Sequence, residues 1–385
     1  MSRYSSKLYV IDLFQFKFLF TNSLYNPIGV EPVGSINLES SHQVLSDKQY
    51  SDFLNLTNDV FYPLKNFVTK NEFIFILKRK ILNKKFFPFP IFFGLSREQF
   101  KTIKNKKNLV LVYKSKKIAK INKLDFFHIS HDLFGKKIFG KNFINHPYYK
   151  VFKKENYIFL NFNIIKKYKK QNLLKNFTAP KVFKKKIKRI GLLPGFHTRN
   201  APHAAHQWIH EYLFKKYGSL LIQPLIGQYK KGEYQDSYIM KTNQKAVQII
   251  KSKKVFCLPF FSYPRYGGPR ESALHAIVRK NYGCTHFWVG RDHAGYKNFY
   301  SKYQSQKFCK FFKKKIGINI VSEKEPYYCK KYQRIGNNFK KISKKDKILI
   351  SGTKIRNYIL RKKPIPKYMM SPKISNLLGY KSLIK

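Results

Sequence analysis

Hydrophobic residues follow one pattern up to about residue 175 and another after it. In the first part, short apolar runs alternate with basic turns, as at Phe73–Leu77, Pro90–Phe93 and Leu109–Tyr113. A turn at Lys114–Lys117 follows the last of these runs and leads into another apolar run, as between neighbouring strands. This pattern predicts a compact, mostly β domain over residues 1–175, interrupted by only a few helices.

The lysine-dense stretch 165–189 is a candidate linker. Beyond it, Pro194–Gly195 is a predicted break, and apolar runs predict strands at Arg189–Leu193, Leu220–Gln223, Val255–Phe261 and Thr285–Val289. Helical spacing is found at His203–Lys216, Gln244–Lys251 and Glu271–Asn281. Strands that alternate with helices predict βαβ units and a parallel sheet, an α/β fold. The last residues predict a Tyr- and Lys-rich loop, a strand at Ile348–Ile350 and a helix from about Thr353.

The composition allows a large core. Of 385 residues, 43% are hydrophobic and 17% aromatic, which suits two or three domains and excludes a disordered chain or a fibre. No stretch approaches the roughly 18 uncharged apolar residues of a membrane span. Four cysteines are too few for a disulfide scaffold and indicate a reducing compartment, hence the cytoplasm. Residues 8–20 are apolar but contain Asp12 and Lys17, so a signal peptide is not expected, whereas an organellar transit segment stays open.

The charge balance is strongly basic, with 78 Lys and Arg against 19 Asp and Glu and a net charge of +59. Two explanations compete. AT-rich codons enrich Lys, Asn, Ile, Phe and Tyr together, while a polyanion binder selects for basic residues. Nucleic-acid binders concentrate their charge on one face or tail, but here lysines are spread over the chain, which favours codon bias. Small anionic substrates would benefit from the field in either case.

Two segments that follow predicted strands carry candidate chemistry. Gly195–His206 leads from a strand into a helix and holds Thr198, Arg199 and Asn200, followed by His203 and His206 on one helical face. Cations, neutral donors and a helix N-terminus favour phosphate, although a metal pair or incidental histidines are the alternatives. Gly290–Gly295 follows Thr285–Val289 and carries Arg291, Asp292 and His293 between glycines, which favours ligand contact over an ordinary polar turn.

Two further segments allow both a structural and a functional role. In Tyr266–His275, a glycine-proline turn leads into a helix where Arg270 and Glu271 could pair locally, with structure as plausible as catalysis. In Ile350–Arg356, Ser351 and Thr353 can cap the next helix. The same helix start can hold phosphate with help from Lys354 and Arg356.

Taken together, these segments resemble the ATP sulfurylase (sulfate adenylyltransferase) family of the nucleotidylyltransferase superfamily. The resemblance rests on HTRNAPHAAH at 197–206, IGQYKKGEY at 226–234, RYGGPRESALHAIVRKNYGCTHFWVGRDHAG at 265–295 and ISGTKIR at 350–356, with weaker likeness in FLNLTNDVFYPLKNFV at 53–68 and HPYYKVF at 146–152. It implies a PUA-like β-rich domain over 1–175, a Rossmann-like parallel-sheet catalytic domain over 176–318 and a small C-terminal α/β domain over 319–385.

The resemblance implies the reaction ATP + sulfate ⇌ adenylyl sulfate + diphosphate, with sulfate attacking the α-phosphorus directly. Such a transfer needs placement and charge compensation rather than an enzyme nucleophile, and no Ser–His–Asp set is evident. It also implies Mg²⁺ accompanying ATP, and relatives that associate into oligomers. The direction of flux, including ATP formation in sulfur oxidation, is not fixed by the sequence.

Site residues are implied position by position. Thr198, Arg199 and Asn200 form the catalytic group. ATP contacts are implied for His197, Thr198, Arg199, Asn200, His203, His206, Gly290, Arg291, Asp292, His293 and, at adenine, Val321. Of these, His203 and His206 face the leaving diphosphate. Sulfate contacts are implied for His197, Arg199 and Ala294, the last through its backbone. No resident metal ligands are expected.

The sequence departs from the family pattern at two places. His197 stands where the family commonly has Gln, and although both side chains can donate to an oxyanion, His would add a charge below its pKa. Ala204 and Ala205 stand where an Arg is common between the two motif histidines, which loses one cation. Neither change removes a core group, so an active enzyme is expected.

Two alternative functions and one negative expectation complete the predictions. A catalytically idle, basic nucleic-acid-binding relative would exploit the charge, but the intact motifs argue against it. A different nucleotidylyltransferase is disfavoured by the long 265–295 block. Some relatives carry a Y-C-x-x-C knuckle that can hold zinc. Here Cys329 is followed by Tyr332 in place of the second cysteine, so no structural zinc is expected.

Overall fold

The computed structural model describes residues 42–384 except 156, 169–173, 175 and 228–229. All described elements belong to one compact unit, Ser40–Lys385. The apolar stretch 8–20 and two residues of the 226–234 block lie outside the described residues. Among the described residues, no helix has the length and apolar character needed to cross a membrane.

The N-terminal part combines a five-stranded sheet with helices. Its strands are β1 (His42–Val44), β4 (Phe93–Leu95), β5 (Asn108–Tyr113), β6 (Lys116–Phe127) and β7 (Ile158–Lys167), in the order β1-β5-β6-β7-β4, and a short pair is formed by β2 (Ile81–Leu82) and β3 (Lys85–Phe86). Its helices are α1 (Asp47–Thr57), α2 (Lys70–Arg79), α3 (Arg97–Ile103), α4 (His131–Phe139) and α5 (Pro147–Glu155). The strand predicted at Leu109–Tyr113, its turn and the following run are confirmed as β5 and β6. Helices are more frequent here than the sequence predicts.

The strand predicted at Phe73–Leu77 is wrong, because these residues lie inside α2. Thr69 begins the helix with a capping box in which its side chain accepts the Glu72 N–H and the Glu72 side chain accepts the Thr69 N–H. Phe73, Ile76 and Leu77 are buried at helical spacing. A five-residue apolar run fits a strand and a helix equally well, and the cap decides between them.

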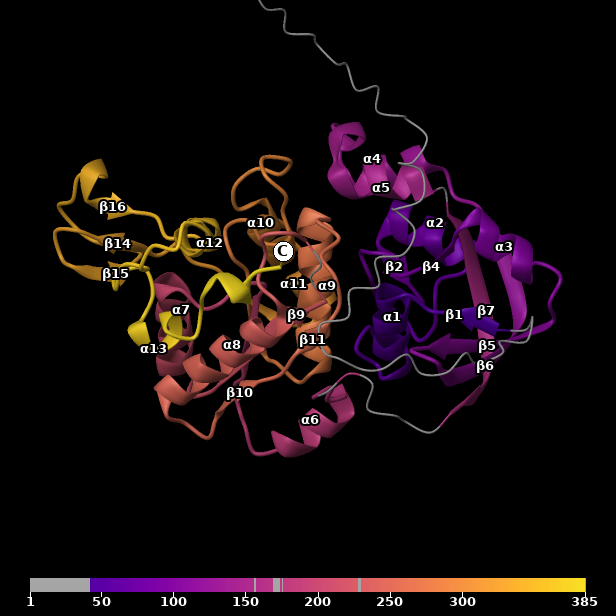
Figure 1. Cartoon of the computed structure of the whole chain (residues 1–385), viewed down its shortest axis with the longest axis horizontal. Coiled ribbons are helices and arrows are strands. Elements are labelled where there is room, and N and C mark those ends of the chain that lie inside the picture. Colours follow the sequence, from indigo (N-terminus) through magenta and orange to yellow (C-terminus); the bar gives the residue numbers. More distant parts are fainter. Residues whose placement is uncertain (1–41, 156, 169–173, 175, 228–229, 385) are drawn as a thin grey trace, which may run out of the picture. The chain divides into compact units, whose positions relative to one another are not determined.

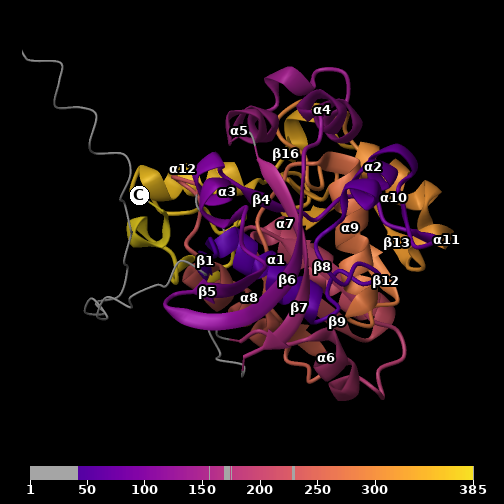
Figure 2. The same cartoon turned by 90° about the vertical axis from the view of Figure 1, so that its right-hand side faces the viewer.

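The middle part is built on a parallel sheet. The chain runs through α6 (Pro180–Lys186), β8 (Pro194–Thr198), α7 (Ala204–Tyr217), β9 (Leu220–Ile226), α8 (Asp236–Ile250), β10 (Val255–Cys257), β11 (Phe260–Phe261), α9 (Gly268–Asn281), β12 (His286–Trp288), α10 (Gln304–Phe311), α11 (Lys313–Ile316) and β13 (Asn319–Val321). The strand order is β10-β9-β8-β12-β13, with β11 beside β9 and every pair parallel (Figures 1 and 2). The predicted α/β class is therefore confirmed, and the order reverses between β8 and β12.

One strand boundary differs from the prediction. Arg189–Leu193 forms no strand, and the predicted break at Pro194–Gly195 lies inside β8. Proline can begin a strand because its missing N–H is not needed there. Gly195 suits the next position, since a Cβ there would lie 2.7 Å from Arg279 Cγ.

Helices cover both faces of the parallel sheet. Phe196, Ile222 and Trp288 pack against Ile209 and Leu213 of α7. On the opposite face, the core that contains Leu221, Leu225 and Phe287 also contains Leu274, Ile277 and Val278 of α9. That second core is continuous with the aromatic core of the N-terminal part. Because helices cover both faces of the sheet, β8 and β9 consist largely of buried residues.

The last part contains a three-stranded antiparallel sheet, β14 (Tyr327–Cys329), β15 (Arg334–Gly336) and β16 (Lys347–Ile348), followed by α12 (Gly352–Leu360) and α13 (Pro372–Ser375). The sequence predicts a loop where β14 and β15 lie. Aromatic side chains pack around this sheet: Tyr332 stacks on Phe339 at 5.4 Å, and Tyr328 of β14 lies 4.7 Å from Tyr368.

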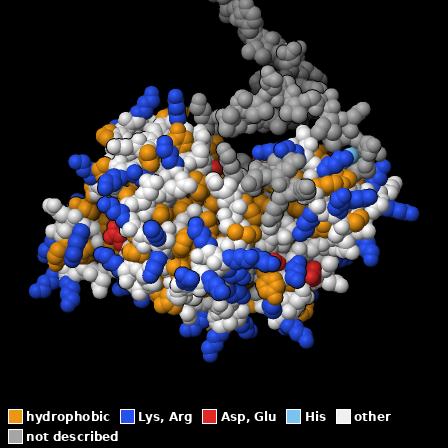
Figure 3. Space-filling view, turned by 90° about the horizontal axis from the view of Figure 1, so that it is seen from below, with side chains coloured by type: hydrophobic (Ala, Val, Ile, Leu, Met, Phe, Trp, Pro, Cys, Tyr) orange, Lys and Arg blue, Asp and Glu red, His pale blue; other side chains and the backbone are white. Residues whose placement is uncertain are grey.

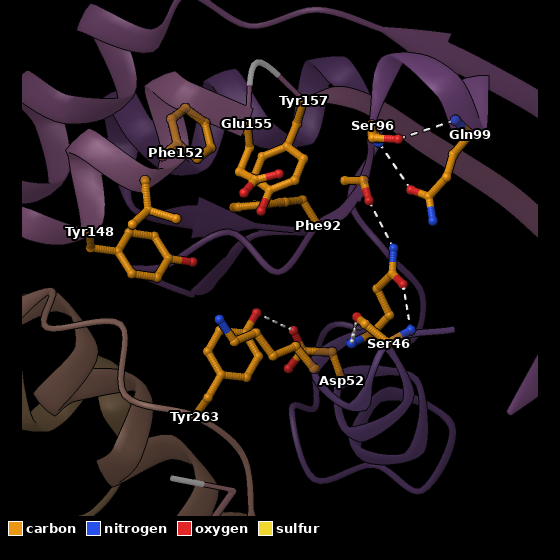
Figure 4. A pocket seen from close by; sticks show the side chains of 14 residues that line it. Ser46, Asp52, Phe92, Ser96, Gln99, Tyr148, Phe152, Glu155, Tyr157 and Tyr263 are labelled. Carbon is orange, nitrogen blue, oxygen red and sulfur yellow. Dashed lines mark hydrogen bonds between the residues drawn. The ribbon is translucent and has the colours of Figure 1, made fainter. Parts of the chain in front are cut away.

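Buried polar contacts connect the N-terminal part to the middle part. Asp52 of α1 forms a salt bridge with Arg265 at 2.6 Å and accepts a hydrogen bond from Tyr263. Figure 4 shows the Tyr263–Asp52 hydrogen bond beside a pocket that Tyr148 and Tyr157 also line. Arg270 donates to the Leu77 carbonyl at 2.9 Å and the Pro88 carbonyl at 3.2 Å. The predicted local pair of Arg270 with Glu271 is therefore not formed, and Arg270 instead bonds backbone carbonyls of the N-terminal part.

Candidate active site

A pocket lies at the carboxyl ends of β8 and β12, next to the point where the strand order reverses. Its lining is His197, Thr198, Arg199, Asn200, His206, Leu225, Pro264, Tyr266, Glu271, His275, Asp292, His293 and Ala294. The structure thus brings most of the predicted site residues together, although they come from two segments about ninety positions apart. Ligands of doubly wound folds bind at such switch points.

The Thr198–Asn200 turn is held from three directions. Thr198 Oγ1 accepts the Asn200 N–H at 3.1 Å, which closes the turn on itself. Arg356 of α12 donates to Asn200 Oδ1 at 2.8 Å, and Asn243 of α8 donates to the Asn200 carbonyl at 3.3 Å. Ser351 caps α12 by accepting the Lys354 N–H. The ISGTKIR segment therefore supports the site through Arg356.

Arg199 provides a fixed charge at the pocket. Its guanidinium lies 5.1 Å from the centre of the Tyr266 ring, a cation–π contact that orients the side chain. Asp292 and Glu271 are the carboxylates of the lining, and burial raises the pKa of both. Glu271 accepts the N–H groups of Arg265 at 2.9 Å and Gly267 at 2.8 Å, which fixes the turn before α9.

The two histidines of the H-x-x-H motif are stacked at the start of α7. His203 is the N-cap, and its Nδ1 accepts the His206 N–H at 3.4 Å. Their ring centres are 3.8 Å apart, and only His206 lines the pocket. Burial lowers the pKa of His206 to about 4, and burial together with His206 lowers the pKa of His203 well below its usual range. The helix start therefore presents neutral imidazoles.

Only part of the GRDHAG segment lines the pocket. Asp292, His293 and Ala294 line the pocket, whereas Gly290 and Arg291 do not. Arg291 instead forms a salt bridge with Glu325 at 2.7 Å. Val321 also lies outside the lining. It is buried at the end of β13, where its carbonyl accepts the Val289 N–H at 2.9 Å.

Helix α9 supplies two residues of the site that the sequence reasoning missed, His275 and Arg279. His275 lines the pocket together with Glu271, for which catalysis was left open, and Arg279 lies behind it with its Nη2 2.7 Å from His197 Nδ1. His275 Nδ1 is 3.0 Å from His293 Nε2. Glu271, His275 and Arg279 follow one another at intervals of four, which places them on one helical face. That spacing is a signal readable in the sequence.

Three of these side chains form the group of metal-capable residues found within the described parts of the chain. One ligand atom each of His197, His275 and His293 lies within 4.8 Å of the others. Their other contacts favour an anion instead. Arg279 already occupies His197 Nδ1, the other two rings are hydrogen-bonded to each other, and Arg199 and Arg279 bring positive charge. A divalent cation would meet repulsion here, whereas an oxyanion would meet donors.

The pocket therefore has the donors and positive charge that suit an anion, and it lies at the switch point of a parallel sheet in an α/β fold. A family model described as ATP-sulfurylase matches residues 175–380, and one described as a PUA-like domain matches residues 36–161. The chain belongs to the ATP-sulfurylase family.

Individual relatives agree with this assignment. A protein of Pyrococcus abyssi named sulfate adenylyltransferase is 32% identical over 341 residues, covering 85% of this chain and 87% of the relative. Its namesake in Ignicoccus hospitalis is 30% identical over 339 residues, with the same coverage.

A solved structure shares the fold. The hexameric APS kinase from Thiobacillus denitrificans superposes with a TM-score of 0.65 at 13% identity, over 87% of this chain. The chain spans 62% of that structure, less than two thirds of its length.

Proposed function

We propose that this protein is a sulfate adenylyltransferase that joins ATP and sulfate to form adenylyl sulfate and diphosphate. A sulfate oxygen forms a bond to the α-phosphorus of ATP, the bond from that phosphorus to the bridging oxygen breaks, and diphosphate leaves with both electrons of that bond. The observation that carries the proposal is the clustering of Thr198, Arg199 and Asn200 with histidines in one pocket at the switch point. The same site serves the reverse reaction, which makes ATP from adenylyl sulfate and diphosphate.

The chemistry of the lining supports direct in-line transfer without a covalent enzyme intermediate. The Thr198 hydroxyl accepts a hydrogen bond from the Asn200 N–H. Among the described residues, the pocket lining holds no cysteine. What the lining offers is charge and hydrogen-bond donors. Such groups accelerate a phosphoryl-type transfer by positioning and by stabilising the charge that develops on the leaving group.

Each predicted residue has a proposed role. Arg199, His197 and the Ala294 backbone hold sulfate, and Thr198, Arg199 and Asn200 stabilise the transition state. His203 and His206 face the departing diphosphate at the start of α7, where the helix dipole favours anions. ATP contacts extend to Gly290, Arg291, Asp292 and His293, with adenine near Val321. Mg²⁺ enters as part of the substrate MgATP. Of the two carboxylates in the lining, Glu271 accepts hydrogen bonds from the turn before α9, so Asp292 is the one that faces MgATP.

Two assays test the proposal directly. Purified protein with MgATP and sulfate should release diphosphate, and with adenylyl sulfate and diphosphate it should form ATP. Arg334→Ala removes an exposed arginine on β15 that does not line the pocket, and serves as a control for loss of positive charge. If neither direction proceeds while the protein binds single-stranded nucleic acid, the idle-relative alternative replaces the proposal. Activity with another acceptor anion alone would indicate a different nucleotidylyltransferase.

We also propose a cytoplasmic homo-oligomer. The cysteines Cys257, Cys284, Cys309 and Cys329 are all free, which supports a reducing compartment. Self-association is supported by the resemblance to a family whose members associate. Light scattering after size exclusion gives the molar mass directly, and a mass equal to that of one chain would contradict the oligomer.

A further inference from the structure

Arg279 is a buried cation that reaches the pocket only through a histidine. Its side chain is fully buried on α9. One guanidinium nitrogen lies 2.7 Å from His197 Nδ1 and 3.3 Å from the Gln223 carbonyl, and the other donates to the His275 carbonyl at 3.3 Å. Phe260 and Phe287 lie against its faces at 5.0 and 5.6 Å. The guanidinium is therefore fixed in one orientation.

We infer that Arg279 is a positioning residue that holds His197 in the tautomer with its proton on Nε2, so that this N–H is available to the substrate anion. This inference rests on the proposed function, because it assigns the partner of that N–H as the sulfate. It concerns a residue that contacts no substrate itself. It also explains how a histidine can stand where the family commonly has glutamine.

Hydrogen-bond chemistry fixes the tautomer. A guanidinium carries only donors, so the His197 Nδ1 that it contacts must present a lone pair. The ring cannot be doubly protonated either, because an N–H at Nδ1 would point at the arginine N–H. A neutral imidazole has one proton, and that proton is then on Nε2. We assign the tautomer on this network.

The charges around His197 keep it neutral. The titratable and charged groups that face it are His275 and Arg279 from α9, His293 and Asp292 from the segment after β12, Arg199 from its own turn, and Glu271 across the pocket. Burial first, and then His275 and Arg279, lower the pKa of His197 well below its usual range. The expectation that His197 would add a positive charge is therefore not supported.

The same geometry leaves the charge of Arg279 available to an anion. Among the described residues, no carboxylate forms a salt bridge with Arg279, and its Nε has no hydrogen-bond partner. A buried cation without a counter-ion is costly, and a bound dianion one imidazole ring away offsets part of that cost. His197 thus stays neutral and donates its Nε2–H, while the positive charge of Arg279 lies directly behind its ring. A glutamine whose carbonyl accepts from the same arginine would present its amide N–H in the same direction.

The tautomer can be measured without any activity assay. The two-bond nitrogen–proton correlations of histidine distinguish Nε2–H, Nδ1–H and doubly protonated rings. Protein labelled with ¹⁵N only in histidine is compared with His197→Gln, which identifies the His197 signals by their loss. We expect the Nε2–H pattern at pH 7. An Nδ1–H or doubly protonated His197 would overturn the inference, whatever the enzyme's activity.

The Arg279→Met variant tests the consequence, with Arg279→Lys as the conservative variant. We expect Arg279→Met to lower kcat/KM for sulfate by about tenfold or more, and Arg279→Lys to recover part of it. Without the arginine, no fixed donor holds a lone pair at His197 Nδ1, so the same ¹⁵N measurement on Arg279→Met should show a larger fraction of the Nδ1–H tautomer. The double variant His197→Gln/Arg279→Met should lose little more kcat/KM than Arg279→Met alone, because both changes act on one donor.

The outcomes separate the inference from the proposed function. A wild-type protein inactive in both directions but with an Nε2–H His197 refutes the function and leaves the tautomer assignment standing. An active enzyme in which Arg279→Met keeps the wild-type Nε2–H pattern of His197 shows that Arg279 is only structural. If Arg279→Met fails to fold, the tautomer measured in wild-type protein still decides the inference.

Discussion

Arg199 brings a fixed charge to the part of the pocket where sulfate and the α-phosphate are proposed to meet. We expect Arg199→Ala to lower kcat by about 10²–10³, on the order of 3 kcal/mol, because a preorganised charged donor is lost from the transition state. Its melting temperature should stay near that of wild type, since the side chain is half-exposed. Steady-state kinetics and thermal denaturation measure both. Retained activity within tenfold of wild type, with the Arg334→Ala control equally active, would contradict the assignment.

Burial of the site histidines makes the protein sensitive to acid. Burial lowers the pKa of His206 to about 4 and that of His293 to about 3, from an ordinary value of 6.5. Between pH 6.5 and 4 the unfolded chain therefore binds protons that the folded chain does not, so folding stability falls as the pH falls. We expect the melting temperature to drop by roughly 5 °C or more over this range. Thermal denaturation across the series measures it.

Two variants locate the origin of that pH dependence. His206→Gln should flatten the curve of melting temperature against pH, because one protonation that opposes folding is gone. His128→Gln, at an exposed position in the N-terminal part, should leave the curve as in wild type. A melting temperature that is flat from pH 6.5 to 4 would refute the explanation.

At the residue scale, the sequence identifies the site by residue type and misses what supports it. The Thr198–Asn200 turn and Asp292–Ala294 could be predicted because polar residues next to glycine at strand ends have few structural uses. His275 and Arg279 lie in a helix that is buried on nearly all sides, and nothing in the local sequence says which side faces a pocket. The interval of four between them is visible, but its meaning depends on where β8 lies.

Helix α9 packs so closely against β8 that adding a methyl group at Gly195 should destabilise the fold. A Cβ on Gly195 would lie 2.7 Å from Arg279 Cγ and 3.1 Å from Cys284 Sγ. We expect Gly195→Ala to lower the free energy of unfolding by about 1–3 kcal/mol, because the core must shift to accept it. Gly191→Ala is the matched control, since a Cβ there meets nothing within 4 Å. Urea denaturation compares them, and equal stability of the two variants would contradict the packing argument.

The sheet β14–β16 is predicted to need no metal. Cys329 is fully buried, no cysteine follows it and no histidine follows His293, whereas a closed zinc site needs four such ligands. Tyr332 and Phe339 stack instead. We expect no stoichiometric zinc by elemental analysis and an unchanged melting temperature after chelation. One zinc per chain, lost together with stability on chelation, would show the opposite.

At the element scale, the sequence predicts the parallel sheet better than the N-terminal part. In the middle part, buried strands and amphipathic helices alternate over enough residues to separate them, so β9 and α7 appear at or near their predicted places. In the last part, α12 also begins where the sequence predicts it. The errors fall on short apolar runs. Phe73–Leu77 is helical because of its capping box, and Arg189–Leu193 gives way to a strand that begins at Pro194. Both outcomes depend on neighbours outside the run.

The charge of the whole molecule should act on its substrates from a distance. Figure 3 shows lysine and arginine side chains distributed over the face in view, with few acidic side chains among them. A net charge of +59 attracts anions, and salt screens that attraction over about 10 Å at 0.1 M. We expect the KM values for ATP and sulfate to rise as salt is raised from about 0.05 to 0.5 M. KM values that do not change would mean that the charge reflects codon usage alone.

The Arg356–Asn200 hydrogen bond sets the moment in protein synthesis at which the site is completed. Its two residues are 156 positions apart, and the bonds of Arg270 to the N-terminal part span more than 180. At about 5–20 residues per second, Arg356 is added roughly 8–30 s after Asn200. The emerging chain can therefore form the parallel sheet around β8 while the catalytic turn still lacks its support from α12. We therefore expect a chain cut before residue 356 to contain the strands around β8 while its Thr198–Asn200 turn lacks the hydrogen bond from Arg356.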